Sequence, residues 1–272
     1  MKHKISINTL CLYFTILSSF SFFSFTGPTN EVQEDARAPY KIKTIVIDPG
    51  HGGHDGATRG VIAREKDVAL QVALKLGKSI EKEMKDVKVI YTRKTDIFVK
   101  LYERIEIANA NNADLFISVH CNSMPKRPGT EKVRGTETFI SGFHRMGEQD
   151  VAMRENASIL LEENYEENYN FDPTDPESLI IFSLMKNQYR NQSFHLASLV
   201  QEEFAKSGRI NRGVKEQGLA VLARAGMPAI LTEIGFISNR TEERYMTSAE
   251  GQAEIVKNLT DAIKAYKAEV EK

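Results

Sequence analysis

The chain has few cysteines and no excess of charge of either sign. Its 272 residues include only Cys11 and Cys121, and Cys11 lies in an apolar N-terminal stretch. If that stretch is removed, one thiol is left, so no internal disulfide can form and the core must stabilise the fold. The 36 basic and 37 acidic side chains give a formal net charge of -1, which provides no field to attract nucleic acid or an anionic membrane. We therefore expect no nucleic-acid partner.

The N-terminal residues differ from the rest of the chain. Lys2, His3 and Lys4 precede an apolar stretch, so residues 1–26 are predicted to be a secretory signal peptide. An uncleaved anchor is the alternative, because the stretch is long and no small-x-small cleavage site precedes Gly27. Residues 27–41 are polar, contain two prolines and show no periodicity, which predicts a disordered leader. We expect an exported protein, located in the periplasm or cell envelope.

Strand and helix patterns alternate from residue 42 to the end, and we expect one domain over 42–272. Short apolar runs predict strands at 44–47, 87–91, 114–120, 135–142, 218–225 and 228–238. Apolar residues spaced by four predict a helix from Val68 to Met84, and helices are also expected at 101–112, 177–207 and 242–271. This order favours an α/β fold with an open, mostly parallel six-stranded sheet and helices on both faces. Residues 145–178 break the order and are predicted to be a helical insertion.

Three potential metal ligands fall at one edge of the predicted sheet. His51 follows the first strand, His120 ends the third, and Glu65 opens the first helix on the same side. Ligands of open parallel sheets bind beyond the carboxyl ends of the strands. Two imidazoles and one carboxylate leave a fourth tetrahedral position for water, as in catalytic zinc sites. The glycines around His51 let the chain turn sharply and direct this side chain inward.

Glu233 is the candidate catalytic acid and base. It interrupts the apolar run "PAILTEIGF" on the same face as Ala229 and Leu231, where a carboxylate is costly unless it faces a polar site. Beside a metal it could take a proton from water and pass it to a leaving nitrogen.

Each of these residues also has a purely structural explanation. His51 could be a solvated loop residue, His120 a hydrogen-bonded core histidine, Glu65 a carboxylate favoured by the helix dipole, and Glu233 the partner of Arg64 or Arg224 in a buried ion pair. Their convergence on one edge favours the site. His54, His144 and His195 are placed outside the metal shell. Strand alternation turns Cys121 to the opposite face, as a buried apolar residue.

Five segments in order resemble a known family: "IVIDPGHGGHDGA", "REKDVAL", "YTRKTDIFVKLYERIEIANANNADLFISVHCNS", "GTETFI" and "PAILTEIGFISNRTEERYM". Together, across residues 43–265, they are similar to the zinc-dependent N-acetylmuramoyl-L-alanine amidases, the amidase 3 family. The resemblance implies a Zn²⁺ cofactor held by His51, Glu65 and His120, with Glu233 as catalytic residue. It also implies a peptidoglycan substrate, hydrolysed at the amide between the lactyl group of N-acetylmuramic acid and L-alanine.

The insertion resembles the extra segment of division-type members, in which a helix covers the cleft until a partner with a LytM-type domain removes it. The helix at 150–165 would be the lid, and Glu155, Glu162 and Glu163 could reach the metal. The alternative is a helix that only packs on the sheet. No wall-binding repeat is recognisable in the sequence, which favours a partner; the protein itself is expected to be a monomer.

Two other functions remain open. One is a zinc amidohydrolase of soluble muropeptides or peptides. The other is an inactive wall-binding regulatory domain, which is disfavoured because all four site positions carry competent residues.

Overall fold

The computed structural model describes residues 40–142, 146–169, 178, 180–182 and 188–272. Pro39–Lys272 form one compact unit. The expected signal peptide at 1–26, and all but the last two residues of the expected leader, lie outside the described residues. In the described part of the chain, no helix is both long enough and apolar enough to span a membrane.

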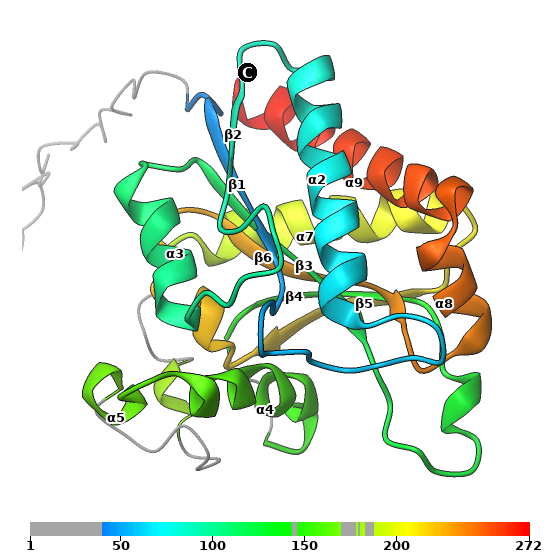
Figure 1. The fold of residues 1–272 in the computed structure, drawn as a ribbon. Coiled ribbons are helices and arrows are strands. Elements are labelled where there is room, and N and C mark those ends of the chain that lie inside the picture. Colours follow the sequence, from blue (N-terminus) through cyan, green and yellow to red (C-terminus); the bar gives the residue numbers. More distant parts are fainter. Residues whose placement is uncertain (1–39, 143–145, 170–177, 179, 183–187) are drawn as a thin grey trace, which may run out of the picture. The chain divides into compact units, whose positions relative to one another are not determined.

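The centre of this unit is a six-stranded sheet. Its strands are β1 (Thr44–Pro49), β2 (Lys88–Tyr91), β3 (Leu115–Asn122), β4 (Thr136–Ser141), β5 (Asn211–Gln217) and β6 (Ala229–Phe236). The spatial order is β2-β1-β3-β6-β4-β5 (Figure 1). All neighbours pair in parallel except β4 and β6, which are antiparallel. The predicted open, mostly parallel sheet is confirmed.

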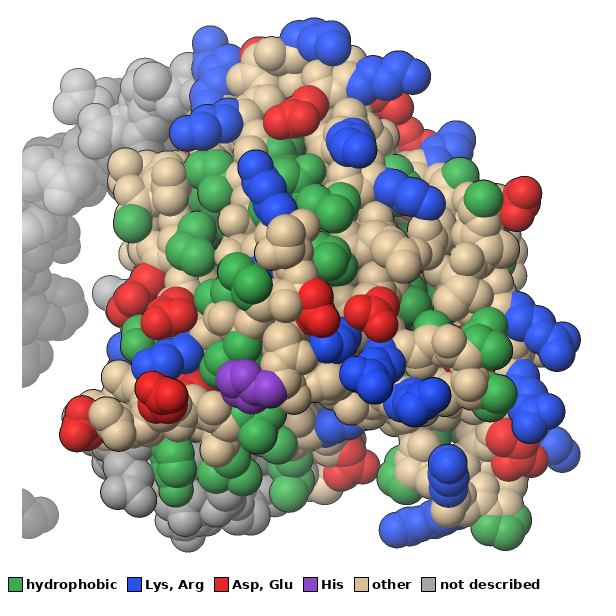
Figure 2. Space-filling model, viewed as in Figure 1, with side chains coloured by type: hydrophobic (Ala, Val, Ile, Leu, Met, Phe, Trp, Pro, Cys, Tyr) green, Lys and Arg blue, Asp and Glu red, His purple; other side chains and the backbone are tan. Residues whose placement is uncertain are grey.

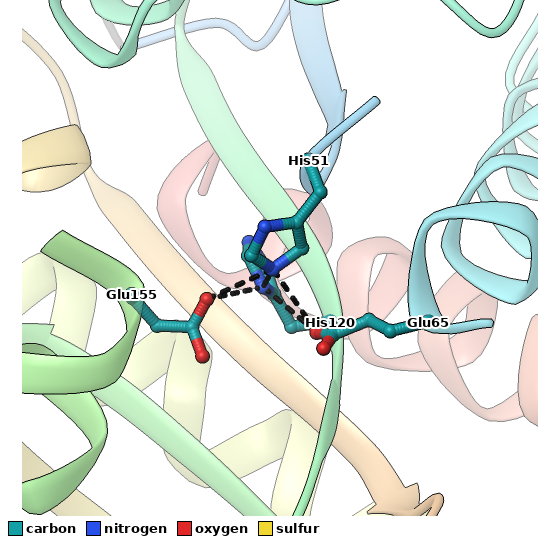
Figure 3. Close-up of side chains that lie close together, drawn as sticks. All are labelled: His51, Glu65, His120 and Glu155. Carbon is teal, nitrogen blue, oxygen red and sulfur yellow. Dashed lines mark hydrogen bonds and ion pairs between the residues drawn. The ribbon is translucent and has the colours of Figure 1, made fainter. Parts of the chain in front are cut away.

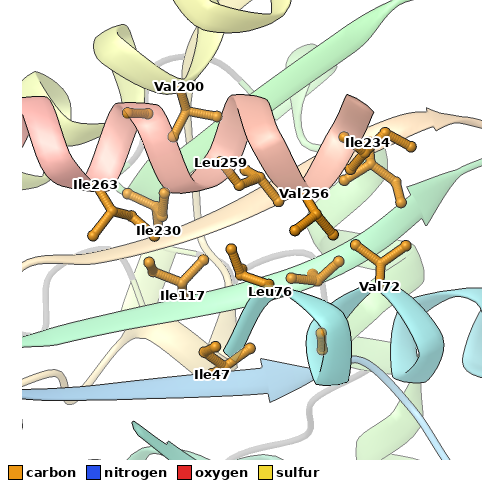
Figure 4. Close-up of a cluster of buried hydrophobic side chains, with 14 of the residues drawn as sticks. Ile47, Val72, Leu76, Ile117, Val200, Ile230, Ile234, Val256, Leu259 and Ile263 are labelled. Carbon is orange, nitrogen blue, oxygen red and sulfur yellow. The ribbon is translucent and has the colours of Figure 1, made fainter. Parts of the chain in front are cut away.

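Helices cover both faces of the sheet, as predicted. One face carries α2 (Glu65–Glu83), α7 (Arg190–Lys206) and α9 (Ala249–Val270). Figure 4 shows Leu76 of α2 and Leu259 of α9 packed over Ile117 of β3. Burying each such side chain contributes about 1.5–3 kcal/mol, which stabilises the fold without a disulfide. Cys121 is a free, buried thiol in this cluster, as predicted.

The other face carries α3 (Leu101–Ala110) and the inserted segment, which contains α4 (Asp150–Asn156), the 3₁₀ turn η3 (Ala157–Leu161) and α5 (Tyr165–Asn168). A second apolar cluster fills the space between them and the sheet. Because Ala229 and Leu231 belong to this cluster, the same face of β6 presents Glu233 to the insertion.

The strand predicted at 218–225 is wrong. These residues form a turn that includes the 3₁₀ helix η4 (Ala220–Leu222) and packs in the second cluster. A short apolar run does not by itself distinguish a strand from a buried turn. The strand that completes the sheet is β5, the polar stretch "NRGVKEQ", which lies at the sheet edge.

Two helix boundaries also differ from the prediction. The helix expected at 177–207 is not continuous, because Gln188 and Tyr189 form a turn and α7 begins at Arg190; residues 183–187 lie outside the described residues. The expected closing helix is two helices, α8 (Arg240–Thr247) and α9. Ser248 separates them and caps α9 by accepting a hydrogen bond from Gly251 N.

Candidate metal site

Four buried side chains bring one ligand atom each to a common point at the carboxyl edge of the sheet: His51, Glu65, His120 and Glu155. Figure 3 shows Glu155 entering from α4 and Glu65 from α2, on opposite sides of the two imidazoles. The four atoms lie within 4.8 Å of one another. Five of their separations are short.

His51 Nε2 lies 3.1 Å from His120 Nδ1, 3.3 Å from Glu65 Oε1 and 3.0 Å from Glu155 Oε2. His120 Nδ1 lies 3.2 Å from Glu65 Oε1 and 3.0 Å from Glu155 Oε2. Around a tetrahedral zinc with bonds of about 2.0–2.1 Å, ligand atoms are about 3.3–3.4 Å apart. The observed spacing and the nitrogen and oxygen donors therefore fit such an ion.

The backbone around His51 is shaped for this position. His51 itself has a left-handed φ of 58°, a conformation that is uncommon outside glycine. Gly50 has to be a glycine because a Cβ there would come within 2.5 Å of the His120 ring. Asp55 accepts a hydrogen bond of 2.9 Å from His51 Nδ1, which leaves Nε2 to face the cluster. Ser158 of the insertion donates to the same Asp55 oxygen.

Glu65 is the first residue of α2, as predicted, but its carboxylate is not a solvated helix-dipole partner. It is completely buried. Its Oε2 accepts a hydrogen bond of 2.7 Å from Thr58 Oγ1, and its Oε1 accepts one from Cys121 N. These bonds aim Oε1 at the two imidazoles.

The two imidazoles and two carboxylates of the cluster shift one another's pKa values. Burial lowers the pKa of His120, but Glu155 outweighs it and raises the pKa to about 9. The pKa of His51 is also raised, because Glu65 and Glu155 outweigh burial. Burial favours the protonated forms of Glu65 and Glu155, yet the imidazoles hold both carboxyl pKa values low. The two carboxylates give the cluster the negative charge that a bound dication would offset.

Glu233 lies beside this cluster on β6 and is also completely buried. It is the register partner of His120 across the parallel β3 and β6 strands. Burial raises its pKa, and the nearby Glu155 raises it further. Its Oε1 is 3.2 Å from Arg154 Nη2 of α4, so the alternative pairing with Arg64 or Arg224 is wrong. Its Oε2 has no hydrogen-bond partner among the described residues.

Of the three insertion carboxylates expected near the metal ligands, only Glu155 belongs to the cluster that the structure describes. Glu162 instead accepts hydrogen bonds from Leu101 N at the start of α3 and from the Tyr169 hydroxyl. Glu163 is exposed.

The other histidines lie outside the cluster where the structure describes them. His54 is exposed and contacts Phe98. His195 forms an exposed ion pair with Glu269. His144 lies outside the described residues.

The sequence reasoning missed a buried clamp beneath His51. Arg104 of α3 donates hydrogen bonds to the carbonyls of Pro49 and His51 and to the Asp48 carboxylate, at 2.7–2.8 Å. Arg93 donates to the carbonyls of Pro49 and Gly50. Both guanidinium groups are almost fully buried. Helix-period and strand-period patterns do not identify such residues, because a charged residue is normally read as exposed.

Two imidazoles and a carboxylate at the carboxyl edge of an α/β sheet, with a further carboxylate beside them, form the arrangement used by mononuclear zinc hydrolases. Residues 45–265 match the N-acetylmuramoyl-L-alanine amidase family, amidase 3. The chain belongs to this family.

Individual relatives agree with this assignment. The chain is 36% identical over 234 residues to the N-acetylmuramoyl-L-alanine amidase AmiC of Escherichia coli O6:H1; the match covers 83% of this chain and 53% of the relative. The chain therefore spans about half the length of that relative. The solved N-acetylmuramoyl-L-alanine amidase from Clostridium difficile 630 is 25% identical with a TM-score of 0.62, covering 84% of this chain and 97% of that one. AmiC2 of Nostoc punctiforme is 26% identical with a TM-score of 0.60, covering 82% and 96%.

Proposed function

We propose that this protein is a zinc-dependent N-acetylmuramoyl-L-alanine amidase that hydrolyses the amide between N-acetylmuramic acid and the L-alanine of the stem peptide in peptidoglycan. The observation that carries the proposal is the meeting of His51, Glu65 and His120 beside a buried Glu233, all within the residues that match the amidase family. Cell-wall remodelling and daughter-cell separation are the processes that need this cleavage.

His51, Glu65 and His120 are the proposed metal ligands. Zn²⁺ held there would supply a Lewis acid that polarises the amide carbonyl and acidifies a water. Asp55 keeps the His51 Nδ1 proton and so presents Nε2 as the donor atom. Glu233 is the proposed base and acid: its Oε2 takes the proton of the attacking water and then delivers it to the leaving alanine nitrogen.

We further propose that the insertion at 145–178 regulates this site. Glu155 fills the place that a catalytic site keeps open for water or substrate. Arg154 pairs with Glu233 and neutralises the catalytic carboxylate. In this arrangement the site is inhibited, and removal of the insertion would activate it. Deleting 145–178 should raise the basal rate of a folded protein; no increase would remove this part of the proposal.

The context that fits this activity is the cell envelope. A signal peptide at 1–26 would export the chain to the periplasm, where peptidoglycan is located. A partner with a LytM-type domain is the proposed activator, which displaces the insertion from a monomeric enzyme.

Digestion of purified sacculi and of soluble muropeptides, followed by mass spectrometry, tests the function. Release of intact stem peptides that stops with a chelator and returns with Zn²⁺ supports the proposal. Cleavage of soluble muropeptides alone would instead favour the amidohydrolase alternative. Zinc binding with no cleavage of either substrate, even after deletion of the insertion, would favour the inactive domain.

A further inference from the structure

A further acidic residue, Glu137, lies in line with His120 and Glu233 across the sheet. His120 of β3 is the register partner of Glu233 of β6, and Glu233 is the partner of Glu137 of β4. Register partners in adjacent strands present their side chains to the same face. Glu137 is only 3% exposed, so its charge must be satisfied by neighbouring groups.

Glu137 is fully engaged by three donors. Its Oε1 accepts hydrogen bonds from Arg212 Nε at 2.6 Å and from Lys215 Nζ at 2.7 Å. Its Oε2 accepts one from Asn122 Nδ2 at 2.8 Å. Glu137 therefore fixes the cations of Arg212 and Lys215 beside the site.

A β-bulge places both cations on the same side of β5. Arg212 and Lys215 are three residues apart, and regular alternation would turn them to opposite faces. Between Thr136 and Thr138 of β4, however, the paired position in β5 moves from Asn211 to Val214, so that β5 has one residue more than its partner. Gly213, with a φ of 91°, lies in this irregular segment. The extra residue reverses the alternation and aims both side chains at Glu137.

The two cations line a groove of about 1,070 Å³. Figure 2 shows the surface hollowed between the insertion and the loop at 123–135, where this groove lies. The side chains of Arg212 and Lys215 are 35% and 43% exposed. The Arg212 guanidinium lies over the Phe236 ring, 5.1 Å from its centroid, which restrains its orientation.

Arg212 has hydrogen-bond donors that are not used within the described structure. It uses Nε for Glu137, and its two terminal nitrogens donate no hydrogen bond to any residue that the structure describes. Two cations against one carboxylate leave one positive charge. A planar guanidinium with two parallel donors is matched to a carboxylate ligand.

The position of Glu233 indicates which part of a substrate would lie here. A second pocket, of about 430 Å³, lies on the His51 side, and Arg154 lines both pockets. Glu233 is next to Glu137, hence towards the larger groove. In the proposed amidase mechanism the group that protonates the leaving nitrogen must reach it directly, so we expect the leaving peptide on the Glu233 side and the sugar on the other.

We propose that Arg212 and Lys215, held by Glu137, form a subsite that binds a free carboxylate of the leaving stem peptide. The proposal rests on the proposed amidase function. The subsite would lie on β5, outside the metal cluster. Peptides with a free carboxylate should bind better than the same peptides with a carboxamide.

The test compares two synthetic N-acetylmuramoyl dipeptides, one ending in L-alanyl-D-glutamate, which has two free carboxylates, and one ending in the diamide of L-alanyl-D-glutamate, which has none. The full chain is used with and without Glu155→Ala, so that one form has no Glu155 carboxylate in the metal cluster. We expect a kcat/KM preference of about tenfold or more for the free acid, expressed in KM. Arg212→Gln should remove most of this preference, and Arg212→Lys should restore part of it.

Lys206→Gln is the matched control, because Lys206 is an exposed cation on α7 that pairs with Glu203 and does not line the groove. Equal kcat/KM for the two substrates, or an unchanged preference in folded Arg212→Gln and Lys215→Gln variants, would overturn the subsite while leaving the amidase function intact. Cleavage of neither dipeptide and of no sacculi would overturn both proposals.

Discussion

The Arg154 guanidinium lies between two carboxylates, with Nη2 3.2 Å from Glu233 Oε1 and Nε 3.0 Å from Glu155 Oε1. Two consecutive residues of α4 thus engage both halves of the candidate site. Glu155 contacts the two imidazoles, and Arg154 contacts the proposed catalytic carboxylate. This single turn of helix is the structural basis for proposing that the insertion inhibits the enzyme.

Removing either contact should activate the protein. Glu155→Ala frees the fourth ligand position, and Arg154→Ala removes the charge that neutralises Glu233. We expect each substitution to raise the basal rate of stem-peptide release at least severalfold, measured on sacculi at equal zinc content. Glu163→Ala is the control, because Glu163 is an exposed residue of the same insertion. A rate unchanged in both variants would mean that α4 only packs on the sheet.

The Arg104 clamp should be essential for stability. Arg104→Ala leaves the buried Asp48 carboxylate without its ion-pair partner, which should cost about 3–5 kcal/mol of the free energy of unfolding. Urea titration of the metal-free protein measures this loss. Lys257→Ala removes an exposed pair with Asp261 and should change stability by less than about 1 kcal/mol. Similar losses of unfolding free energy in Arg104→Ala and Lys257→Ala would show that the Arg104–Asp48 pair contributes no more than an exposed ion pair.

The same clamp should affect metal binding. Arg104 donates to the carbonyl of His51, the residue held at a positive φ. Arg104→Lys keeps the charge but loses the fork of donors, and we expect zinc affinity to fall about 10- to 100-fold. Competition with a chromophoric chelator measures the affinity. An unchanged affinity in the folded variant would show that the His51 loop holds its shape without the guanidinium.

Asp48 should make stability depend on pH. Burial raises its pKa, but the Arg104 guanidinium and hydrogen bonds from two hydroxyl groups outweigh burial and hold the pKa below its ordinary value. A lowered pKa in the folded state stabilises the protein above the unfolded-state pKa of about 3.9, and this contribution is lost as the pH falls below it. Urea titrations of the chelated protein from pH 5 to pH 3 should show a smaller decline in Asp48→Asn than in the wild type. Parallel declines would contradict this assignment.

The sequence alone was sufficient to predict strands and site residues where the local hydrophobic pattern agrees with the observed burial. The strands before His51 and at His120 are buried on both faces, so their apolar runs are unambiguous, and the sheet rule then places both histidines and Glu65 at one edge. Glu233 could be found because a carboxylate inside an apolar strand needs a polar site. Glu137 lies between two threonines in "GTETFI", so no apolar run indicates that it is buried.

The remaining features depend on tertiary contacts. β5 is a polar edge strand that alternates irregularly around Gly213, so no period-2 pattern identifies it. Arg154 has the sequence context of an exposed helical residue, and only the docking of α4 brings it to Glu233. The break between α8 and α9 is the exception, because Ser248 is of a residue type preferred at helix N-caps and therefore gave a local signal.

The most direct test of the account is the number of new L-alanine amino termini in purified sacculi after incubation with the zinc-loaded full chain. Glu155→Ala and the double variant Glu155→Ala, Glu233→Gln should be compared at equal zinc content. We predict that Glu155→Ala exposes L-alanine amines in a chelator-sensitive reaction and that the double variant exposes almost none. Absence of new L-alanine termini with folded, zinc-loaded Glu155→Ala, or full activity of the double variant, would contradict the proposed amidase site.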